Sequence, residues 1–180
     1  VAEMIGINYH SKDIILNDND GNELILPRKN QIPYEYYKKG NSVKALLTDV
    51  ISKNGKTEII LSRTSPLFLE RILESEIDEI DEGIIGIKYL AREAGDKSKI
   101  VVESFNEKID PVGVIVGNKG SRINSISKEL NNERLDIIKY TDNYHLLITR
   151  LLAPAKISNI NIVDDKISVY LDADQMGLAI

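Results

Sequence analysis

The sequence predicts a multidomain chain: an all-β module first, then an α+β module, then a truncated second copy of that α+β module. Three observations carry this prediction. Apolar stretches of strand length alternate with turn residues as far as Ser62. A capped helix at Ser65 then opens a mixed pattern of helices and strands. Finally, the pattern of Asp110–Val116 recurs in Asp174–Ile180, at an offset of 64 residues.

Length and composition are those of an ordinary globular protein. The chain has 180 residues, of which 42% are hydrophobic and 28% charged, and the length alone predicts one domain or at most two. Its apolar runs are too short to span a bilayer, and it opens on no signal-peptide pattern. The absence of cysteine excludes disulfides and thiolate chemistry, and it permits a cytoplasmic location. Because the chain does not begin with Met, we expect it to be a fragment.

Charge is unevenly distributed. The net charge of −5 argues against indiscriminate binding of polyanions but leaves room for a local basic groove. Residues 1–64 are nearly neutral, Glu74–Glu82 holds six acids and no base, and residues 97–134 carry seven bases against five acids. The acidic run reads most simply as a solvated helix end and loop. The alternatives are a docking face for a basic partner and a repulsive wall that keeps nucleic acid on the other side. A metal site there is not expected, because the carboxylates have no His or Cys companion.

The first 64 residues predict a small barrel. Five strands are expected, with hairpin turns at Asp20-Gly21 and Asn54-Gly55. The strands are Val1–Tyr9, Asp13–Asn17, Glu23–Leu26, Val43–Ile51 and Thr57–Ser62. The long third connection, which holds Pro27, Pro33 and the Tyr34–Tyr37 cluster, is expected to include a short helical turn. This arrangement is typical of an OB-type barrel, which often binds oligonucleotides by stacking bases on aromatic side chains. Since the strands offer only Tyr9 for stacking, a barrel that merely spaces other domains is the alternative.

Residues 65–141 change the pattern. Ser65-Pro66 caps a helix that packs Leu67, Phe68, Ile72 and Leu73. Two strands, Gly83–Ala91 and Ile100–Phe105, follow around a polar turn, Arg92–Lys99. Two short helices come next, and Leu135–Tyr140 makes a third strand.

The two short helices meet at Gly117-Asn-Lys-Gly120. Asp110 and Pro111 open the first helix, whose buried residues are Val112, Ile115 and Val116. Ser121 is expected to cap the second, whose buried residues are Ile123, Ile126 and Leu130. Glycines permit a close approach, and free amides near a helix N-terminus favour an anion. No acid occurs from Gly117 through Lys128, while Lys119 and Arg122 add positive charge. The turn therefore predicts a clamp for a phosphate backbone, although a helical corner relieved by glycines explains an isolated GxxG equally well.

The order of elements favours the clamp. Helix, strand, strand, helix, GxxG, helix, strand is the type II KH arrangement, and KH domains hold short runs of nucleotides with their GxxG loop. The remaining residues, 142–180, predict a truncated second KH domain: a helix at Tyr144–Leu152 that ends near Pro154, then strands Ala155–Val163 and Lys166–Leu171 around Asp164-Asp165. We expect this copy to bind RNA poorly and the native chain to continue past Ile180.

The chain resembles the NusA family of bacterial transcription elongation, termination and antitermination factors, in which an S1-type barrel precedes two type II KH domains. The stretches that carry the resemblance are Ile25–Arg28 with Gln31–Pro33, Leu61–Thr64, Ala91–Gly95 through Lys97–Lys99, Asp110–Gly113, Val116–Ile123 and Asp174-Gln175. Two departures are Asn118-Lys119 in the variable pair of the clamp, where a basic residue is common, and Ala94 where the family usually has proline.

The resemblance implies binding of nascent single-stranded RNA in the cytoplasm, and partnership with RNA polymerase, through regions absent here, and with other elongation factors. It implies no cofactor, metal or catalytic residue. Bases would lie in a groove lined by Ile115, Ile123 and the Ile100–Phe105 strand. The full set of expected RNA-binding residues is Gly117, Asn118, Lys119, Gly120, Ser121, Arg122, Ile115, Ile123, Lys97, Lys99, Arg28 and Arg63. Lys97 and Lys99 read equally well as a solvated turn, and Arg28 and Arg63 as surface charges that brace the contact between modules.

Two rival classes remain. The chain is alternatively an RNA-binding accessory module of an RNA-processing enzyme, since polynucleotide phosphorylase also joins KH and S1 modules, in the reverse order and behind a catalytic core. An enzyme in its own right is not expected: His10 and His145 have no evident catalytic partners, and neither the P-loop nor the dinucleotide-binding spacing is present. The other rival is a protein-interaction scaffold that docks a partner on the acidic run.

Overall fold

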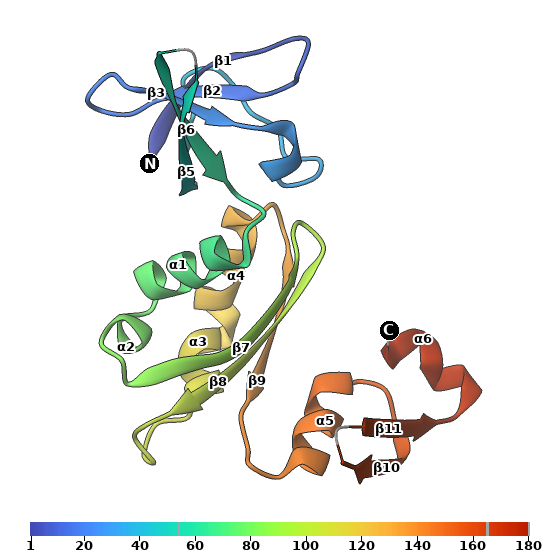
Figure 1. Ribbon diagram of the computed structural model, residues 1–180. Coiled ribbons are helices and arrows are strands. Elements are labelled where there is room, and N and C mark those ends of the chain that lie inside the picture. The colour runs from blue at the N-terminus through green and yellow to red at the C-terminus, as the bar shows by residue number, and fades with distance from the viewer. Residues whose placement is uncertain (54, 165, 180) are drawn as a thin grey trace.

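The computed structural model describes residues 1–53, 55–164 and 166–179 (Figure 1). In these ranges the strands form three sheets, one six-stranded, one three-stranded and one two-stranded. Each sheet draws its strands from a separate stretch of the sequence, and the three follow one another along the chain. The fold is therefore mixed α and β, as the sequence predicts.

The first sheet has the strand order β4-β1-β2-β3-β6-β5. Its strands are β1 (Ala2–Ile7), β2 (Ile14–Asn17), β3 (Glu23–Leu26), β4 (Ser42–Val43), β5 (Leu46–Lys53) and β6 (Lys56–Ser62). All neighbours pair antiparallel except β3 and β6, which are parallel. Within the described residues the pairings do not join the two ends of this order, so a closed barrel is not found and the OB barrel is not confirmed.

Alternation along the strands makes the core of this sheet. Ile14 and Leu16 of β2 are buried, as are Leu24 and Leu26 of β3, because side chains two residues apart share one face of a strand. Of the predicted hairpin turns, the one at Gly21 has a positive φ of 82°, and the Asp18 carboxylate accepts hydrogen bonds from the amides of Asp20 and Asn22. Gly55 also has a positive φ, of 75°, whereas Asn54 lies outside the described residues.

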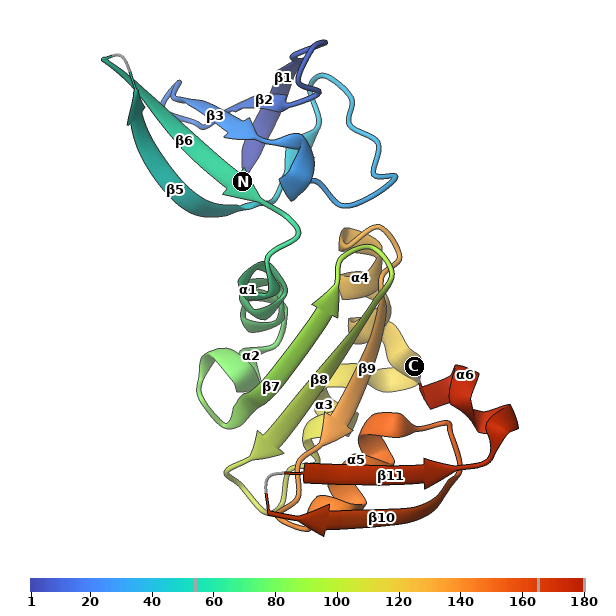
Figure 2. The same ribbon diagram turned by 45° about the vertical axis from the view of Figure 1, so that its right-hand side comes forward.

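The second sheet, with its helices, has the element order that the sequence predicts. Its strands have the order β7-β8-β9, with β9 parallel to β8. The helices α1, α3 and α4 cover one face of the sheet (Figure 2). The elements are α1 (Pro66–Glu76), α2 (Asp78–Asp81), β7 (Ile85–Glu93), β8 (Lys97–Ser104), α3 (Pro111–Val116), α4 (Ser121–Glu129) and β9 (Arg134–Lys139).

Several local predictions need correction here. The strands run through most of the expected polar turn, which shortens to Ala94–Asp96 because Arg92 and Ser98 are paired in the sheet. In α1, Leu69 is buried and Leu67 is 42% exposed, so Leu69 takes the core position that was expected for Leu67. Part of the acidic run forms the helix α2, held by the buried side chains of Ile77 and Ile80.

Two buried arginines connect these elements. The Arg92 and Glu133 side chains are both 0% exposed, and Glu133 also accepts hydrogen bonds from Ser98 Oγ and the Gly95 amide. Arg63 hydrogen-bonds Glu35 in the first module and Glu129 at the end of α4. The two guanidinium carbons lie 5.1 and 5.7 Å from the centre of the Phe68 ring. Ile32 of the first module, 2% exposed, joins the hydrophobic core between the three-stranded sheet and its helices, in residues 65–141, which we call the KH region. The two modules are thus packed together rather than merely linked.

The last region contains α5 (Tyr144–Leu152), β10 (Ile157–Val163), β11 (Lys166–Leu171) and α6 (Met176–Ala179). As expected, α5 ends just before Pro154, and β10 pairs with β11. The predicted turn at Asp164-Asp165 is described only in part, because Asp165 lies outside the described residues, as does Ile180. Leu147 of α5 packs on Val101 and Ile138, so this region lies against the sheet face opposite α1, α3 and α4 (Figure 2).

The internal repeat is only partly matched. Asp110 caps α3, since its carboxylate accepts a hydrogen bond from the Gly113 amide at 3.1 Å. Its counterpart Asp174 instead lies inside a 3₁₀ turn, Ala173–Gln175, and accepts a hydrogen bond from the Gln175 side chain. In the described ranges, no helix combines the length and the apolarity needed to cross a membrane.

Candidate nucleic-acid interface

The GxxG turn has an unusual backbone. Gly117 has φ 73° and ψ 175°, Lys119 has φ 51° and Gly120 has φ 76°. Left-handed conformations of this kind are readily adopted by glycine and are costly for most other residues. The amides of Gly117 and Gly120 donate to the carbonyls of Gly113 and Gly117, and the Ser121 amide donates to Asn118. The amides of Asn118 and Lys119 are therefore the candidates for holding a phosphate.

The exposed side chains of the turn suit an anion. Asn118, Lys119 and Ser121 are all exposed. Ser121 is the first residue of α4 rather than its cap, which corrects the prediction: Gly120 occupies the capping position and has no side chain with which to cap. The amides at the start of a nine-residue helix thus face the loop without a side-chain oxygen in front of them.

Arg122 is held differently from the expectation. Its Nη1 donates to Glu79 Oε2 at 3.1 Å and to the Val114 carbonyl at 3.2 Å. Its aliphatic stem lies against Gly117, where an added Cβ would stand 2.9 Å from Arg122 Cγ. The acidic run is therefore not only a solvated helix end, because one of its carboxylates pairs with a cation of the clamp.

The predicted groove needs two corrections. Ile115 is 0% exposed and has no surface to offer a base; it anchors α3 in the core. Ile100 and Val102 of β8 are also 0% exposed, because β8 is the central strand under the helices. The strand β9 lies at one edge of the sheet, and its half-buried Leu135 and Ile137 face the same core as the half-buried Ile123. The sequence predicts the strand itself, at Leu135–Tyr140, but not its place in the groove, because its edge position follows from parallel pairing with β8, which the sequence does not display.

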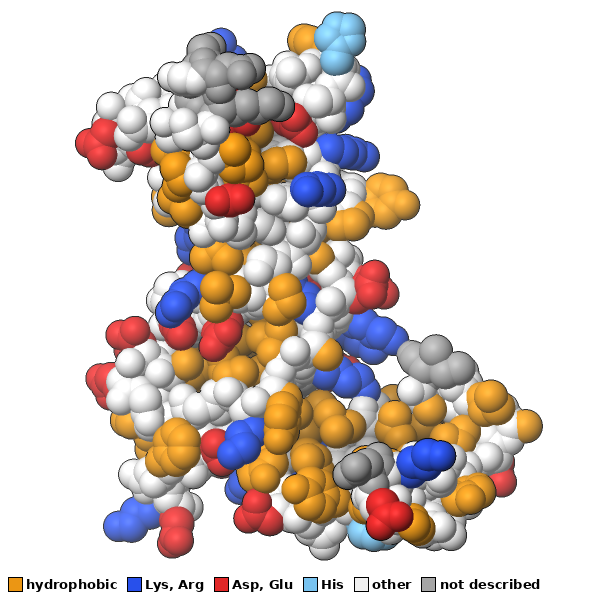
Figure 3. Space-filling model, in the orientation of Figure 1, with side chains coloured by type: hydrophobic (Ala, Val, Ile, Leu, Met, Phe, Trp, Pro, Cys, Tyr) orange, Lys and Arg blue, Asp and Glu red, His pale blue; other side chains and the backbone are white. Residues whose placement is uncertain are grey.

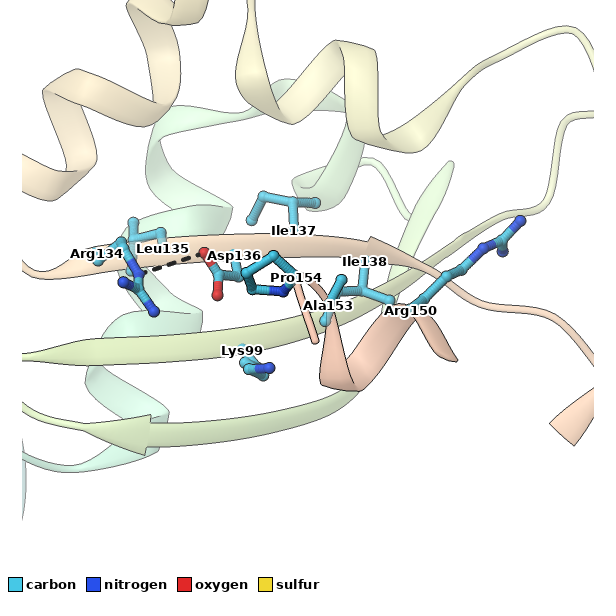
Figure 4. Close-up of a pocket in the computed structure, with 9 residues that line it drawn as sticks. All are labelled: Lys99, Arg134, Leu135, Asp136, Ile137, Ile138, Arg150, Ala153 and Pro154. Atoms are coloured by element: carbon cyan, nitrogen blue, oxygen red, sulfur yellow. Dashed lines mark ion pairs between the residues drawn. The ribbon is translucent and has the colours of Figure 1, made fainter. Parts of the chain in front are cut away.

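Lys97 and Lys99 lie on the other face of the sheet. Side chains alternate along β8, so these two lysines point away from the core that contains Ile100. Lys99 donates a hydrogen bond to the Leu151 carbonyl and helps line a cleft of about 540 Å³ with Arg134, Arg150 and Pro154 (Figure 4). In Figure 3 basic side chains gather at the recess between the KH region and the C-terminal lobe. The structure therefore separates these lysines from the clamp by the thickness of the sheet.

Arg28 and Arg63 also differ from each other. Arg28 is exposed in the first module. Arg63 is 2% exposed and has its guanidinium occupied by Glu35, Glu129 and the Lys44 carbonyl, so it has no surface for RNA. Its geometry matches the alternative interpretation, in which it braces the contact between modules.

The first module exposes more tyrosine rings than the single ring, that of Tyr9, expected from its strands. Tyr34 and Tyr36, in the connection between β3 and β4, are 101% and 78% exposed, and Tyr9 is 82% exposed. The Lys38 ammonium lies 5.7 Å from the centre of the Tyr36 ring. The tyrosine cluster was visible in the sequence, but only the fold shows which of its rings face solvent: Tyr37 is half-buried and donates a hydrogen bond to Glu35.

The described residues contain no group of three or more His, Asp or Glu side chains placed to hold a metal ion. Both histidines are exposed, and the structure brings them into no common site.

Comparison with known proteins adds two findings. Residues 63–140 match the model of a NusA-like first KH domain. The chain is 42% identical to the transcription termination/antitermination protein NusA of Borreliella burgdorferi, over 92% of this chain and 34% of that protein. It is 38% identical to the proteins of the same name from Halalkalibacterium halodurans, over 88% of this chain and 42% of the relative, and Thermus thermophilus, over 91% and 45%. The chain thus spans less than half the length of these curated relatives. Their names do not favour the alternative of an accessory module of an RNA-processing enzyme.

Proposed function

We propose, from the confirmed resemblance of this chain to the NusA family, that it binds single-stranded RNA as a segment of a transcription termination and antitermination factor. The observation that carries the proposal is the Gly117–Gly120 turn. It presents the amides of Asn118 and Lys119, an exposed lysine and a helix N-terminus within the residues that match a NusA-like first KH domain. Such loops hold a nucleotide backbone.

Binding would involve no chemistry. The amides of Asn118 and Lys119 would donate to phosphate oxygens, and the Lys119 ammonium would add attraction. Bases would lie toward the half-buried Ile123 and the edge strand β9, where Leu135 and Ile137 offer apolar surface. Each neutralised phosphate of a single strand contributes about −0.7 to the slope of log affinity against log salt. Affinity should therefore fall as salt is raised, by an amount that reports how many phosphates are neutralised.

The proposal extends to the modules around the clamp. We assign residues 1–64 to an S1-like OB module, residues 65–141 to the first KH domain and residues 142–180 to a truncated second one. The parallel pairing of β3 with β6, and the gap of only Lys44 and Ala45 between β4 and β5, support an OB path in the first module. Contacts with RNA polymerase and other elongation factors in the cytoplasm would involve parts of the relatives that this chain does not span.

The test compares wild type with Asn118→Asp plus Lys119→Asp in a fluorescence anisotropy titration. The probe is a fluorescein-labelled pool of random-sequence single-stranded RNA, titrated across a salt series. Aspartate tolerates the left-handed conformation found at Lys119, so the fold should persist. We expect the double variant to lose most of its affinity and to give a shallower salt slope, with an unchanged circular dichroism spectrum.

The matched control is Asn161→Asp plus Lys166→Asp. It makes the same change of residue types and of net charge at exposed positions on β10 and β11. Retention of affinity by this control, together with its loss in the clamp variant, supports the proposed site. Equal binding by the clamp variant and wild type would mean that RNA binds elsewhere or not at all.

A further inference from the structure

Arg122 and Glu79 form an ion pair across the edge of the clamp. Arg122 Nη1 lies 3.1 Å from Glu79 Oε2, and the two side chains are 42% and 27% exposed. Glu79 belongs to α2, which is fixed against the core by Ile77 and Ile80, at 0% and 9% exposure. Arg122 opens the first turn of α4, immediately after the GxxG loop. A carboxylate from a helix that is distant in sequence therefore occupies the guanidinium of the clamp.

The ion pair between Arg122 and Glu79 is weak enough for a phosphate of RNA to replace the carboxylate. Exposed ion pairs contribute little to protein stability, because both partners are well hydrated when apart. A guanidinium binds phosphate as readily as carboxylate, since both accept its parallel N–H donors. Arg122 Nη1 donates hydrogen bonds to Glu79 Oε2 and to the Val114 carbonyl. The Glu79 carboxylate therefore neutralises the positive charge that would otherwise attract the backbone of RNA.

The surroundings of the ion pair indicate that Glu79 competes with RNA for Arg122 rather than positioning Arg122 for RNA. Glu79 is one of six acids in Glu74–Glu82, a run without a base. Gly117 permits the Arg122 stem to lie across the loop toward α2, where any side chain at Gly117 would collide with it. The backbone of the clamp thus holds Arg122 in the position at which the acidic helix reaches it.

We propose that Glu79 is a competing carboxylate: it holds Arg122 in the RNA-free protein and is exchanged for a phosphate when single-stranded RNA binds. This inference rests on the proposed function and adds the residue that lowers the affinity of the clamp. It gives the acidic run a role in setting RNA affinity, through Arg122, without any partner protein. The run then limits retention of RNA that does not engage the rest of the clamp.

Glu79→Gln removes the competitor and keeps the size of the side chain. Arg122 then becomes available to one more phosphate, so the salt slope should steepen by about 0.7. Such a slope corresponds to roughly three- to tenfold tighter binding at about 50 mM salt, with the difference vanishing near 1 M. The measurement is the same anisotropy titration with the same random-sequence RNA pool.

Two further variants separate exchange from a general change of charge. Glu82→Gln makes the same substitution in the same run, at an exposed side chain, whereas the ion pair of Arg122 is with Glu79. It should tighten binding less and leave the slope unchanged. In an Arg122→Gln background, Glu79→Gln should change RNA affinity no more than Glu82→Gln does, because no guanidinium remains for which Glu79 and a phosphate could compete.

Equal effects of Glu79→Gln and Glu82→Gln, or unchanged affinity in both, would overturn the inference and leave the proposed function standing. Weaker binding by Glu79→Gln would also overturn it, because Glu79 would then position Arg122 for RNA. The proposed function fails separately, if the change at Asn118 and Lys119 leaves binding intact. Absence of RNA binding by both wild type and Glu79→Gln would overturn both.

Discussion

At the scale of single residues, Gly117 is the position on which the clamp depends most. Its φ of 73° and ψ of 175° belong to a region that is essentially restricted to glycine. A Cβ there would also stand 2.9 Å from Arg122 Cγ and 3.1 Å from the Arg122 amide nitrogen. Backbone conformation and space therefore both require glycine, and the second reason is visible only in the structure.

We predict that Gly117→Ala lowers the free energy of unfolding by about 1–3 kcal/mol, from backbone strain and the displaced Arg122 stem. RNA affinity should fall as well, because the amides of Asn118 and Lys119 shift. Urea denaturation followed by circular dichroism measures the first effect. The control is Gly6→Ala, where nothing lies within 4 Å of the added Cβ and no positive φ is required; its change should stay within about 0.5 kcal/mol. Similar losses in both variants would refute the role assigned to Gly117.

At the scale of elements, one buried ion pair fixes how the KH elements meet. Arg92 on β7 donates from Nε and Nη2 to Glu133, just before β9, and from Nη1 to the Ser65 carbonyl, just before α1. Glu133 also accepts from Ser98 Oγ on β8 at 2.6 Å. The pair thus ties β7 and β8 to the residues that immediately precede β9 and α1. This pair is not visible in the sequence, in which Arg92 falls in the predicted polar turn Arg92–Lys99.

Arg92→Met is expected to destabilise the protein by about 3–5 kcal/mol, because it leaves the Glu133 carboxylate buried and uncompensated. The matched comparison is Arg134→Met, which breaks the Arg134–Asp136 pair at 3.6 Å, whose side chains are 67% and 36% exposed. That change should cost less than about 1 kcal/mol. Urea denaturation at neutral pH measures the change in the free energy of unfolding for both variants. A small effect of Arg92→Met would mean that water or a neighbouring cation replaces the guanidinium.

At the scale of the whole molecule, a chain of hydrogen bonds joins the first module to α4. The Tyr37 hydroxyl donates to Glu35, Glu35 pairs with Arg63 at 2.5 Å, and Arg63 reaches Glu129 at 3.1 Å. Burial of the ring, and then the hydrogen bond to the Glu35 carboxylate, raise the pKa of Tyr37 above its ordinary value. Because the folded pKa of Tyr37 is raised, the stability that its neutral form contributes is fully present below the unfolded pKa, at about 10, and is lost progressively as the pH rises from there toward the folded pKa.

We therefore predict that the stability advantage of wild type over Tyr37→Phe is constant below about pH 10 and falls as the pH rises above that value. Above that value wild type should lose up to about 1.4 kcal/mol per pH unit relative to the variant, and less in practice because the half-buried ring is partly screened by solvent. Urea denaturation from neutral pH to the alkaline limit of the assay gives the two curves. Tyr36→Phe, which removes a hydroxyl from an exposed ring, is the control. Parallel curves for wild type and Tyr37→Phe would contradict the assignment.

The sequence by itself determined the order α1, β7, β8, α3, GxxG turn, α4 and β9, together with the capped starts of α1 and α3, but neither α2 nor the separation of β4 from β5. These features depend on neighbours within a few residues: Ser65 and Asp110 each accept a hydrogen bond from an amide two or three residues ahead. Side-chain period and turn chemistry are likewise local, so they can be read from consecutive residues. The resemblance to the NusA family rests on such stretches, so it is visible in the sequence without the fold.

Only the tertiary structure decided which side chains the clamp can use. Ile115, Arg63 and Lys99 look suitable in the sequence, yet the first two are buried and the third lies on the opposite face of the sheet. In the sequence, Glu79 is one of six acids whose role is undetermined. In the structure, α2 places it against Arg122, 43 residues away in the chain. Burial and charge pairing depend on residues that are distant in sequence, and strand pairing and helix packing bring those residues together. For that reason the GxxG turn could be located from the sequence, whereas the ion pair between Arg122 and Glu79 could not.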